Sequence, residues 1–324
     1  MEVNLLDCLK QISRRLAVAA MVCMAWSSIA SAYEYQSGEV TNGGTITGKV
    51  TLNGSIPEPR VFPMVLYPFG DFCKKISDGE GLVLLREFNV DGEGGLQDAV
   101  VAVQDVQRGK PFRSRDTELV TVNCMFHPAD VPESEQFERH DGQLVHVHPL
   151  VTVMRNYSML SVVNRDPIVH AAQVYQPEKG NRVLSFPIPV SLKVNSGYVD
   201  LDQGKRIAQI ICEMHEYMQT WAWVVDNPYF ARTKKGGSFT IENLPPGTYR
   251  VTAWHPHMKP IEKLVTISPN GTATLDFEFD ARQVVRPIYE TQEHFRIPPE
   301  RDPTIDLKGC EGPYCVRREH AHHN

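Results

Sequence analysis

The sequence lacks a long apolar run, an excess of basic charge and, beyond its first 32 residues, an even number of cysteines. No stretch after residue 32 reaches the roughly 18 apolar residues of a membrane-spanning helix, so we expect no integral membrane span. The formal net charge is −6, and nucleic acid is a poor partner because its binding rests on clustered positive charge. The 23 prolines and 22 glycines are spread along the chain, which favours short strands and turns over a helical bundle. We therefore expect an all-β protein, with room for about two domains.

The first 32 residues have the pattern of an export signal. Basic Lys10, Arg14 and Arg15 precede an apolar stretch that is too short to cross a bilayer, and small residues end the segment at Ala32. Cleavage after Ala32 is expected. The sequence thus predicts a signal peptide over 1–32 and a periplasmic or extracellular protein.

Five cysteines remain after the signal peptide: Cys73, Cys124, Cys212, Cys310 and Cys315. In an oxidising compartment an unpaired thiol needs a reason, such as an intermolecular bridge or a metal bond. Cys310 and Cys315 could close a small ring across a Gly-Pro turn, and Cys73 and Cys124 could bridge a β-domain. These pairings would leave Cys212 as the odd thiol.

Cys212, His215 and Met218 follow one another at three-residue intervals. A thiolate, an imidazole and a thioether on one tight loop can converge on a single ion, and soft sulfur donors with imidazole select copper. A second imidazole is expected from His170, which ends the segment Asn164-Arg165-Asp166-Pro167-Ile168-Val169-His170 after an apolar run. The competing interpretations are a zinc site and a buried thiol with ordinary polar histidines. Structural zinc rarely uses a thioether.

The upstream Asn-x-Asp-Pro-x-x-His and the downstream Cys-x-x-His-x-x-Met resemble the cupredoxins, the blue copper electron carriers that include plastocyanin, and the loop spacing is that of amicyanin. The resemblance covers residues 117–227. It implies a Greek-key β-sandwich with one type-1 copper, held by His170, Cys212 and His215 with Met218 as a long axial ligand. Met214 and Glu216 stand where the amicyanin loop carries prolines.

A second pattern runs from Gly236 to His255. Apolar residues alternate with period two on both sides of Pro245-Pro246-Gly247, which predicts a hairpin. The segment resembles the carboxypeptidase regulatory-like domain, an Ig- or transthyretin-like β-sandwich whose usual opening strands occur much earlier, in residues 44–54 and 96–103. We therefore expect a discontinuous sandwich, residues 40–112 plus 228–280, with the cupredoxin domain inserted into it. The alternative is separate domains placed side by side.

Other histidines could form further sites. His146 and His148 lie two apart, so that a strand would present both on one face as a second metal pair, although a solvated face explains them as well. The segment 286–324 is rich in proline, carries three histidines near its end and is expected to be an extended arm.

Together these features predict an exported electron-transfer protein rather than an enzyme, because copper enzymes of this kind need further copper centres and only one such loop is found. The family resemblance implies His215 as a near-surface exit for the electron. Tyr217, Trp221, Glu213 and Glu216 are expected to dock a redox partner such as a cytochrome or a dehydrogenase. The alternative function is copper storage, delivery or sensing, with the second sandwich as a structural module.

Overall fold

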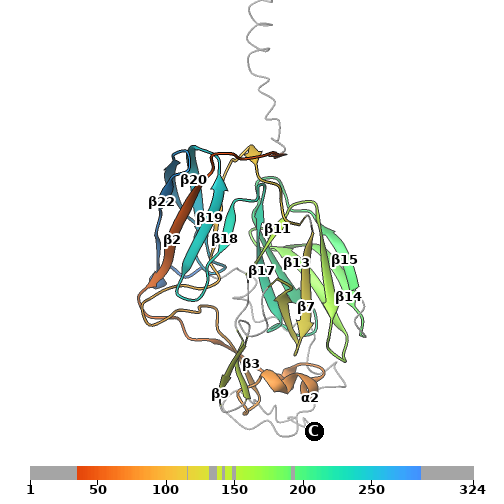
Figure 1. Ribbon diagram of the computed structural model, residues 1–324. Coiled ribbons are helices and arrows are strands. Elements are labelled where there is room, and N and C mark those ends of the chain that lie inside the picture. The colour runs from red at the N-terminus through yellow and green to blue at the C-terminus, as the bar shows by residue number, and fades with distance from the viewer. Residues whose placement is uncertain are drawn as a thin grey trace, which may run out of the picture. The chain divides into compact units, whose positions relative to one another are not determined.

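The computed structural model describes residues 35–114, 116–130, 137–140, 143–147, 151–190 and 194–285. The expected signal peptide, the arm 286–324 with Cys310 and Cys315, and His148 lie outside this range. All described residues belong to one structural unit that begins at Tyr35. Strands dominate this unit, as Figure 1 shows. Among the described residues no helix is long and apolar enough to cross a membrane.

Two sheets in the middle of the chain enclose one core. The first has the order β15-β12-β7-β8 and the second the order β11-β17-β16-β13-β14. Along β12 (Ser158–Asn164) every second residue is buried, as expected for a strand with one face on a core. The other strands are β7 (Thr117–Val122), β8 (Met125–Pro128), β11 (Val151–Arg155), β13 (His170–Gln176), β14 (Asn181–Ile188), β15 (Val194–Val199), β16 (Ile207–Cys212) and β17 (Gln219–Val225).

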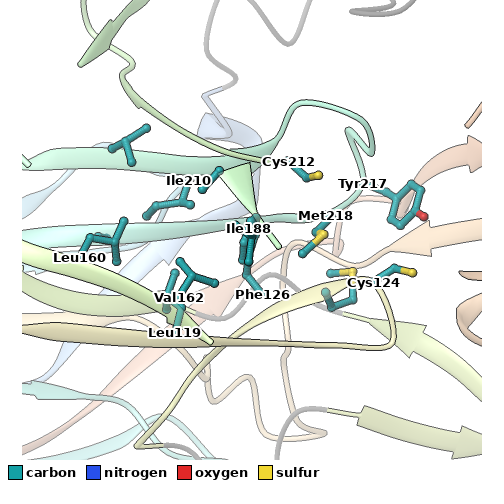
Figure 2. Packing of buried hydrophobic residues seen from close by; sticks show 14 of the residues in the cluster. Leu119, Cys124, Phe126, Leu160, Val162, Ile188, Ile210, Cys212, Tyr217 and Met218 are labelled. Carbon is teal, nitrogen blue, oxygen red and sulfur yellow. The ribbon is translucent and has the colours of Figure 1, made fainter. Parts of the chain in front are cut away.

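The side chains of both sheets meet in a single buried cluster. Leu119 and Leu160 come from one sheet, and Ala172, Ile210 and Val224 from the other. Figure 2 shows part of this cluster, which continues into Cys212 and Met218 at one end. The middle of the chain is therefore a β-sandwich, here called the central sandwich, whose core runs up to the expected ligands.

Strands from both ends of the described chain form a second sandwich, here called the outer sandwich. In one sheet β2 lies between β19 and β22, and β23 also pairs with β2; the other sheet has the order β18-β5-β20-β21. Val50, Val101, Ile241, Val251 and Phe277 share its core. The strands are β2 (Gly44–Asn53), β5 (Val100–Val103), β18 (Phe230–Arg232), β19 (Ser238–Leu244), β20 (Gly247–Trp254), β21 (Ile261–Ile267), β22 (Thr272–Thr274) and β23 (Phe277–Asp280).

Long-range pairing joins the two parts of the outer sandwich. Lys49 of β2 pairs with Ser238 of β19, and Val103 of β5 pairs with Val251 of β20. Strands before the central sandwich are thus hydrogen-bonded to strands after it. The domain boundaries that we propose remain 40–112 plus 228–280 for this sandwich and 117–227 for the central one.

The hairpin expected around Pro245-Pro246-Gly247 is wrong. Both strands exist, but β19 pairs with β2, whereas β20 pairs with β5 and β21. The turn therefore carries the chain from one sheet of the sandwich to the other. Alternation predicts each strand correctly, but it carries no information about which strand lies beside it.

A smaller layer combines part of the segment between β2 and β5 with part of the segment between β8 and β11. Its sheet has the order β3-β4-β10-β9, and three short helical turns follow β3. The elements are β3 (Arg60–Pro63), η1 (Met64–Leu66), α2 (Gly70–Cys73), η2 (Lys74–Ile76), β4 (Leu82–Leu85), β9 (Phe137–His140) and β10 (Gln143–Val147). The remaining elements are β1 (Gln36–Ser37), β6 (Arg108–Gly109) and η4 (Ala281–Gln283). Met64, Cys73 and Ile76 belong to the core cluster of the central sandwich, so the helical turns that follow β3 pack onto that sandwich.

Candidate metal centre

Three of the four expected ligands meet at one end of the central sandwich. His170 is the first residue of β13, Cys212 is the last residue of β16, and His215 lies in the loop that joins β16 to β17. Ala172 pairs with Cys212 across the two strands, which brings His170 to the end of the neighbouring strand. One nitrogen of each histidine and the Cys212 sulfur all lie within 4.8 Å of one another, and all three residues are buried.

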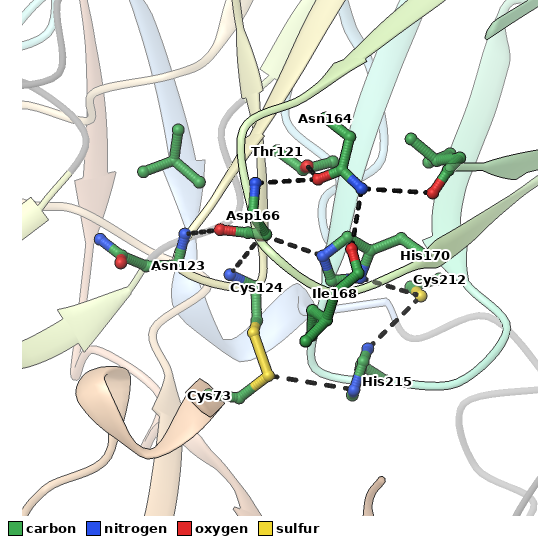
Figure 3. Close-up of polar contacts among 12 residues, drawn as sticks. Cys73, Thr121, Asn123, Cys124, Asn164, Asp166, Ile168, His170, Cys212 and His215 are labelled. Carbon is green, nitrogen blue, oxygen red and sulfur yellow. Dashed lines mark hydrogen bonds and ion pairs between the residues drawn. A yellow bond between two sulfur atoms is a disulfide. The ribbon is translucent and has the colours of Figure 1, made fainter. Parts of the chain in front are cut away.

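The separations suit a transition-metal ion. Cys212 Sγ lies 3.9 Å from His170 Nδ1 and 3.6 Å from His215 Nδ1 (Figure 3). In proteins the corresponding zinc–sulfur and zinc–nitrogen bonds are about 2.3 and 2.0 Å. An ion with such bonds at angles near 120° would place sulfur and nitrogen about 3.7 Å apart. The two sulfur–nitrogen separations are therefore those expected for donors that share one metal ion.

The second nitrogen of each histidine is held by the protein. His170 Nε2 lies 2.9 Å from Asp166 Oδ2, and His215 Nε2 lies 2.9 Å from the carbonyl oxygen of Pro68. Both partners accept hydrogen bonds, so each Nε2 carries a proton and each Nδ1 is turned toward Cys212. Such support from outside the ligand set is what fixes the tautomer and orientation of metal-binding histidines. Both rings thus direct Nδ1, the atom that would bind a metal ion, to the same point as the Cys212 sulfur.

The segment 164–170 is built around a buried asparagine. Asn164 Oδ1 accepts hydrogen bonds from the Thr121 hydroxyl and the Asp166 backbone, while its amide group donates to the carbonyls of Ile168 and Ile188. These bonds fold the turn tightly between β12 and β13 (Figure 3). The Asn-x-Asp-Pro-x-x-His pattern therefore has a structural meaning, because it places Asp166 directly behind His170.

The ligand loop is closed by its own backbone. The Cys212 N–H donates to the Met218 carbonyl, and the Met218 N–H donates to the His215 carbonyl, each at 2.9 Å. The Glu213 N–H donates to the carbonyl of Ala171 on β13. Met218 is buried in the same cluster as Cys212 (Figure 2). The fourth expected ligand thus lies on the same closed loop as the Cys and His donors.

The electrostatics favour a thiolate. Burial opposes charge on the Cys212 thiol, but hydrogen bonds and charge from His170 and His215 outweigh it and lower the pKa to about 5. Burial likewise lowers the pKa of His170, yet the hydrogen bonds to Asp166 and Cys212 raise it to about 9. In the absence of a metal the site therefore holds an ion pair, and the thiolate is the form that binds metals.

Two expectations about the surface of this site are wrong. His215 is completely buried, with 0% of its surface exposed, because Pro68 and its neighbours cover the ring. A partner protein therefore cannot touch this ring directly. Tyr217 and Trp221 are also buried, at 0% and 1% exposure, since both pack inward, and they cannot form a docking surface. Glu213 is exposed and Glu216 is partly exposed.

A disulfide joins Cys73 to Cys124, and Cys212 is a free thiol. His146 lies on β10, but the structure does not describe its side chain or any part of His148, so the second metal pair stays a prediction.

The hydrogen bond from His215 to the Pro68 carbonyl was not predicted from the sequence. A backbone carbonyl leaves no side-chain pattern, and the only signal was the expected bridge from Cys73 to Cys124.

Residues 224–280 match the carboxypeptidase regulatory-like domain. The match begins at the end of β17 and includes β18 to β23 of the outer sandwich. The regulatory-like domain family thus accounts for the later strands of that sandwich, while β2 and β5 lie outside the matched residues.

Solved structures with similarity to the chain include two cupredoxins. A reduced amicyanin variant is 8% identical, with a TM-score of 0.22, and the match covers 36% of this chain and 97% of amicyanin. A purple cupredoxin from Nitrosopumilus maritimus is 13% identical, with a TM-score of 0.21, and the match covers 34% of this chain and 100% of that protein. No curated protein matches the sequence.

Proposed function

We propose that this protein is an exported carrier of single electrons that uses one type-1 copper ion. The observation that carries the proposal is the convergence of two Nδ1 atoms on the Cys212 sulfur, while the Nε2 atom of each ring is hydrogen-bonded to another part of the protein. A buried thiol among ordinary polar histidines would not need this arrangement. An ion bound between the three atoms would account for the arrangement.

The donor set favours copper over zinc. Two imidazoles, one thiolate and a thioether on the same loop are soft and borderline ligands that accept both Cu(I) and Cu(II). Structural zinc sites prefer four Cys or His donors, and among the described residues the group around Cys212 offers only three. Met218 is the remaining donor on the loop, and its thioether suits copper.

The role of the protein is to hold the donors still and to keep water away. Bound copper supplies one-electron exchange. Asp166 and Pro68 keep the rings of His170 and His215 in place from behind, and the loop hydrogen bonds keep Cys212 at the end of β16. Because the ligands are held in place, the reorganisation energy is small when the charge of the ion changes.

Copper storage is a second candidate, and the burial of His215 favours it. A carrier that exchanges electrons through an imidazole needs that ring near the surface, whereas a storage protein gains from a closed site. For the carrier we propose a partner such as a cytochrome or a dehydrogenase, with Glu213 as an exposed charge beside the site. For either function we propose an exported protein, periplasmic or extracellular, on the basis of the amino-terminal pattern.

Spectroscopy of the copper-loaded protein tests the proposal. We expect one copper per chain, an intense blue thiolate-to-copper absorption and reversible reduction, all of which require Cys212. Cys212→Ser should lose the colour while keeping the fold, because serine has a similar shape but no soft thiolate. Met218→Leu should shift the reduction potential. Met214→Leu is the matched control, since Met214 lies on the same loop but is not a proposed ligand, and it should leave the potential unchanged.

Each outcome separates the candidates. Binding of colourless Cu(I) without redox cycling would favour storage over electron transfer. Absence of copper from protein isolated from the export compartment, together with failure to take up copper in vitro, would refute both.

A further inference from the structure

A short segment of the smaller layer covers the imidazole of His215. Residues 64–76, here called the cover, comprise η1, α2, η2 and the turn between them. The Pro68 carbonyl accepts the hydrogen bond of His215 Nε2 at 2.9 Å, and the Phe69 ring centre lies 6.3 Å from that of His215. Cys73 Sγ lies 4.0 Å from the same Nε2. The outer edge of the ring is thus enclosed by the cover.

The cover also packs on the residue two positions beyond His215. The rings of Tyr67 and Tyr217 meet edge to face with centres 5.1 Å apart, and Phe62, just before the cover, lies 6.3 Å from Tyr217. Such aromatic pairs add stabilisation beyond the area that they bury. Both His215 and Tyr217 are completely buried as a result.

A covalent bond fastens the cover to the opposite side of the site. Cys73, at the end of α2, is joined to Cys124, which stands between β7 and β8. The Cys124 N–H donates to Asp166 Oδ2, the oxygen that also accepts from His170 (Figure 3). The disulfide therefore connects the segment that supports His215 to the carboxylate that supports His170.

We propose that the cover, clamped by the Cys73–Cys124 disulfide, positions His215 and closes the site, so that Cys212 is reached much more slowly while the clamp is intact than after it is broken. A dithiol of the kind that reduces protein disulfides would open it. The sulfur–sulfur bond breaks, Cys73 and Cys124 become thiols, and the dithiol loses two electrons and two protons to form its own disulfide. The control of metal exchange that follows rests on the proposed function, but closure over Cys212 does not.

Alkylation of Cys212 in the metal-free protein tests closure without any metal. The extent of reaction with iodoacetamide is followed at Cys212 alone by peptide-resolved mass spectrometry, so that other thiols do not interfere. We expect at least about a tenfold faster reaction in Cys73→Ser/Cys124→Ser, and in dithiol-treated wild type, than in the oxidised protein, since reactivity follows the population of locally open states. Equal rates would overturn the proposal.

Two further variants protect this test against a folding artefact. Phe69→Ala keeps the disulfide but removes a ring from the cover, and it should raise the rate by a smaller factor. Lys74→Ala changes an exposed side chain of the same cover, which pairs with exposed Asp71, and it should leave the rate unchanged. Circular dichroism of each variant shows whether the strands are retained. A rise in the rate for Lys74→Ala equal to that for Phe69→Ala would contradict the role of the covering ring.

The effect of the cover on the His215 ring can be measured separately, from the tautomer of the ring. In the oxidised protein, nitrogen NMR of the His215 ring should show the proton on Nε2, where Pro68 holds it. In Cys73→Ser/Cys124→Ser we expect a mixture of tautomers, which mere loss of stability would not produce. An unchanged tautomer together with an unchanged alkylation rate would refute the cover as a positioning element.

Copper release extends the test to the loaded protein. Release to a strong chelator should be at least about tenfold faster after reduction of the disulfide. If no copper binds, the proposed function fails, while the alkylation result still decides whether the cover closes the site. If copper binds and leaves at the same rate from both forms, the cover does not control metal exchange.

Discussion

Removal of the Asp166 carboxylate should destabilise the protein before any metal is considered. The side chain is buried and accepts three hydrogen bonds, from the backbone N–H groups of Asn123 and Cys124 at 2.7 and 3.0 Å and from His170 Nε2 at 2.9 Å. Asp166→Ala leaves all three donors without this partner. Hydrogen bonds to a charged group are each worth about 1.5–3 kcal/mol, and removal of one partner from a buried ion pair costs about 3–5 kcal/mol. Because these contributions overlap, we expect a loss of about 3–5 kcal/mol in the free energy of unfolding.

Urea unfolding of the metal-free protein measures this loss, with the midpoint and slope recorded for Asp166→Ala and Asp166→Asn. Asparagine keeps one acceptor oxygen and should cost less than alanine. Asp226→Asn is the control, because Asp226 also forms an ion pair, with Arg206, but 58% of its side chain is exposed, and such pairs contribute little. A loss below about 1 kcal/mol for Asp166→Ala would refute the assignment of Asp166 as the support of this site. Copper affinity should fall by about 10–100-fold in the same variant.

Three further predictions concern the titration of the site and the joining of the outer sandwich. In the metal-free protein the ultraviolet absorbance of the Cys212 thiolate should disappear as the pH falls through about 5. The stability that this thiolate gives is complete above the ordinary thiol pKa of 9.0, and it is lost as the pH falls from there through about 5. Persistence of the neutral thiol to pH 8 would contradict the ion pair. Gly48→Ala should cost about 1–3 kcal/mol, because its methyl group would stand 2.0 Å from the Leu275 carbonyl oxygen, whereas Gly92→Ala meets no atom within 4 Å and should be close to neutral in urea unfolding. Thr233→Val should cost about 1–3 kcal/mol, since the buried hydroxyl bonds two backbone groups of the segment before β5, and a neutral result would argue against that link.

The meeting of the proposed ligands His170, Cys212 and His215 could be predicted from the sequence because most of its geometry is local. Cys212 ends β16, and His215 and Met218 lie in the loop of six residues that joins it to the paired strand β17, so the spacing keeps all three close together. His170 was found through the Asn-Asp-Pro pattern, whose hydrogen bonds the structure displays. The all-β class likewise follows from alternation, as along β12.

The errors concern contacts between distant parts of the chain. Exposure of His215 could not be judged from its loop, because the segment that covers it is 147 residues away in the sequence. The strands on either side of Pro245-Pro246-Gly247 were expected to pair with each other, yet their partners β2 and β5 lie before the central sandwich. Local periodicity reports which side chains face a core, and it does not report what lies on the other side of that core.

The interrupted course of the outer sandwich has a consequence for how the chain acquires its structure during synthesis. Strand β2 emerges early, but its partners β19, β22 and β23 follow only after the whole central sandwich has been made. For that time β2 lacks these strand partners, and unpaired strand edges invite aggregation. The central sandwich has all of its sheet partners within residues 117–225. We therefore expect the inner unit to fold first and to bring the waiting ends together, which makes early termination of the chain more damaging to the outer sandwich than to the metal centre.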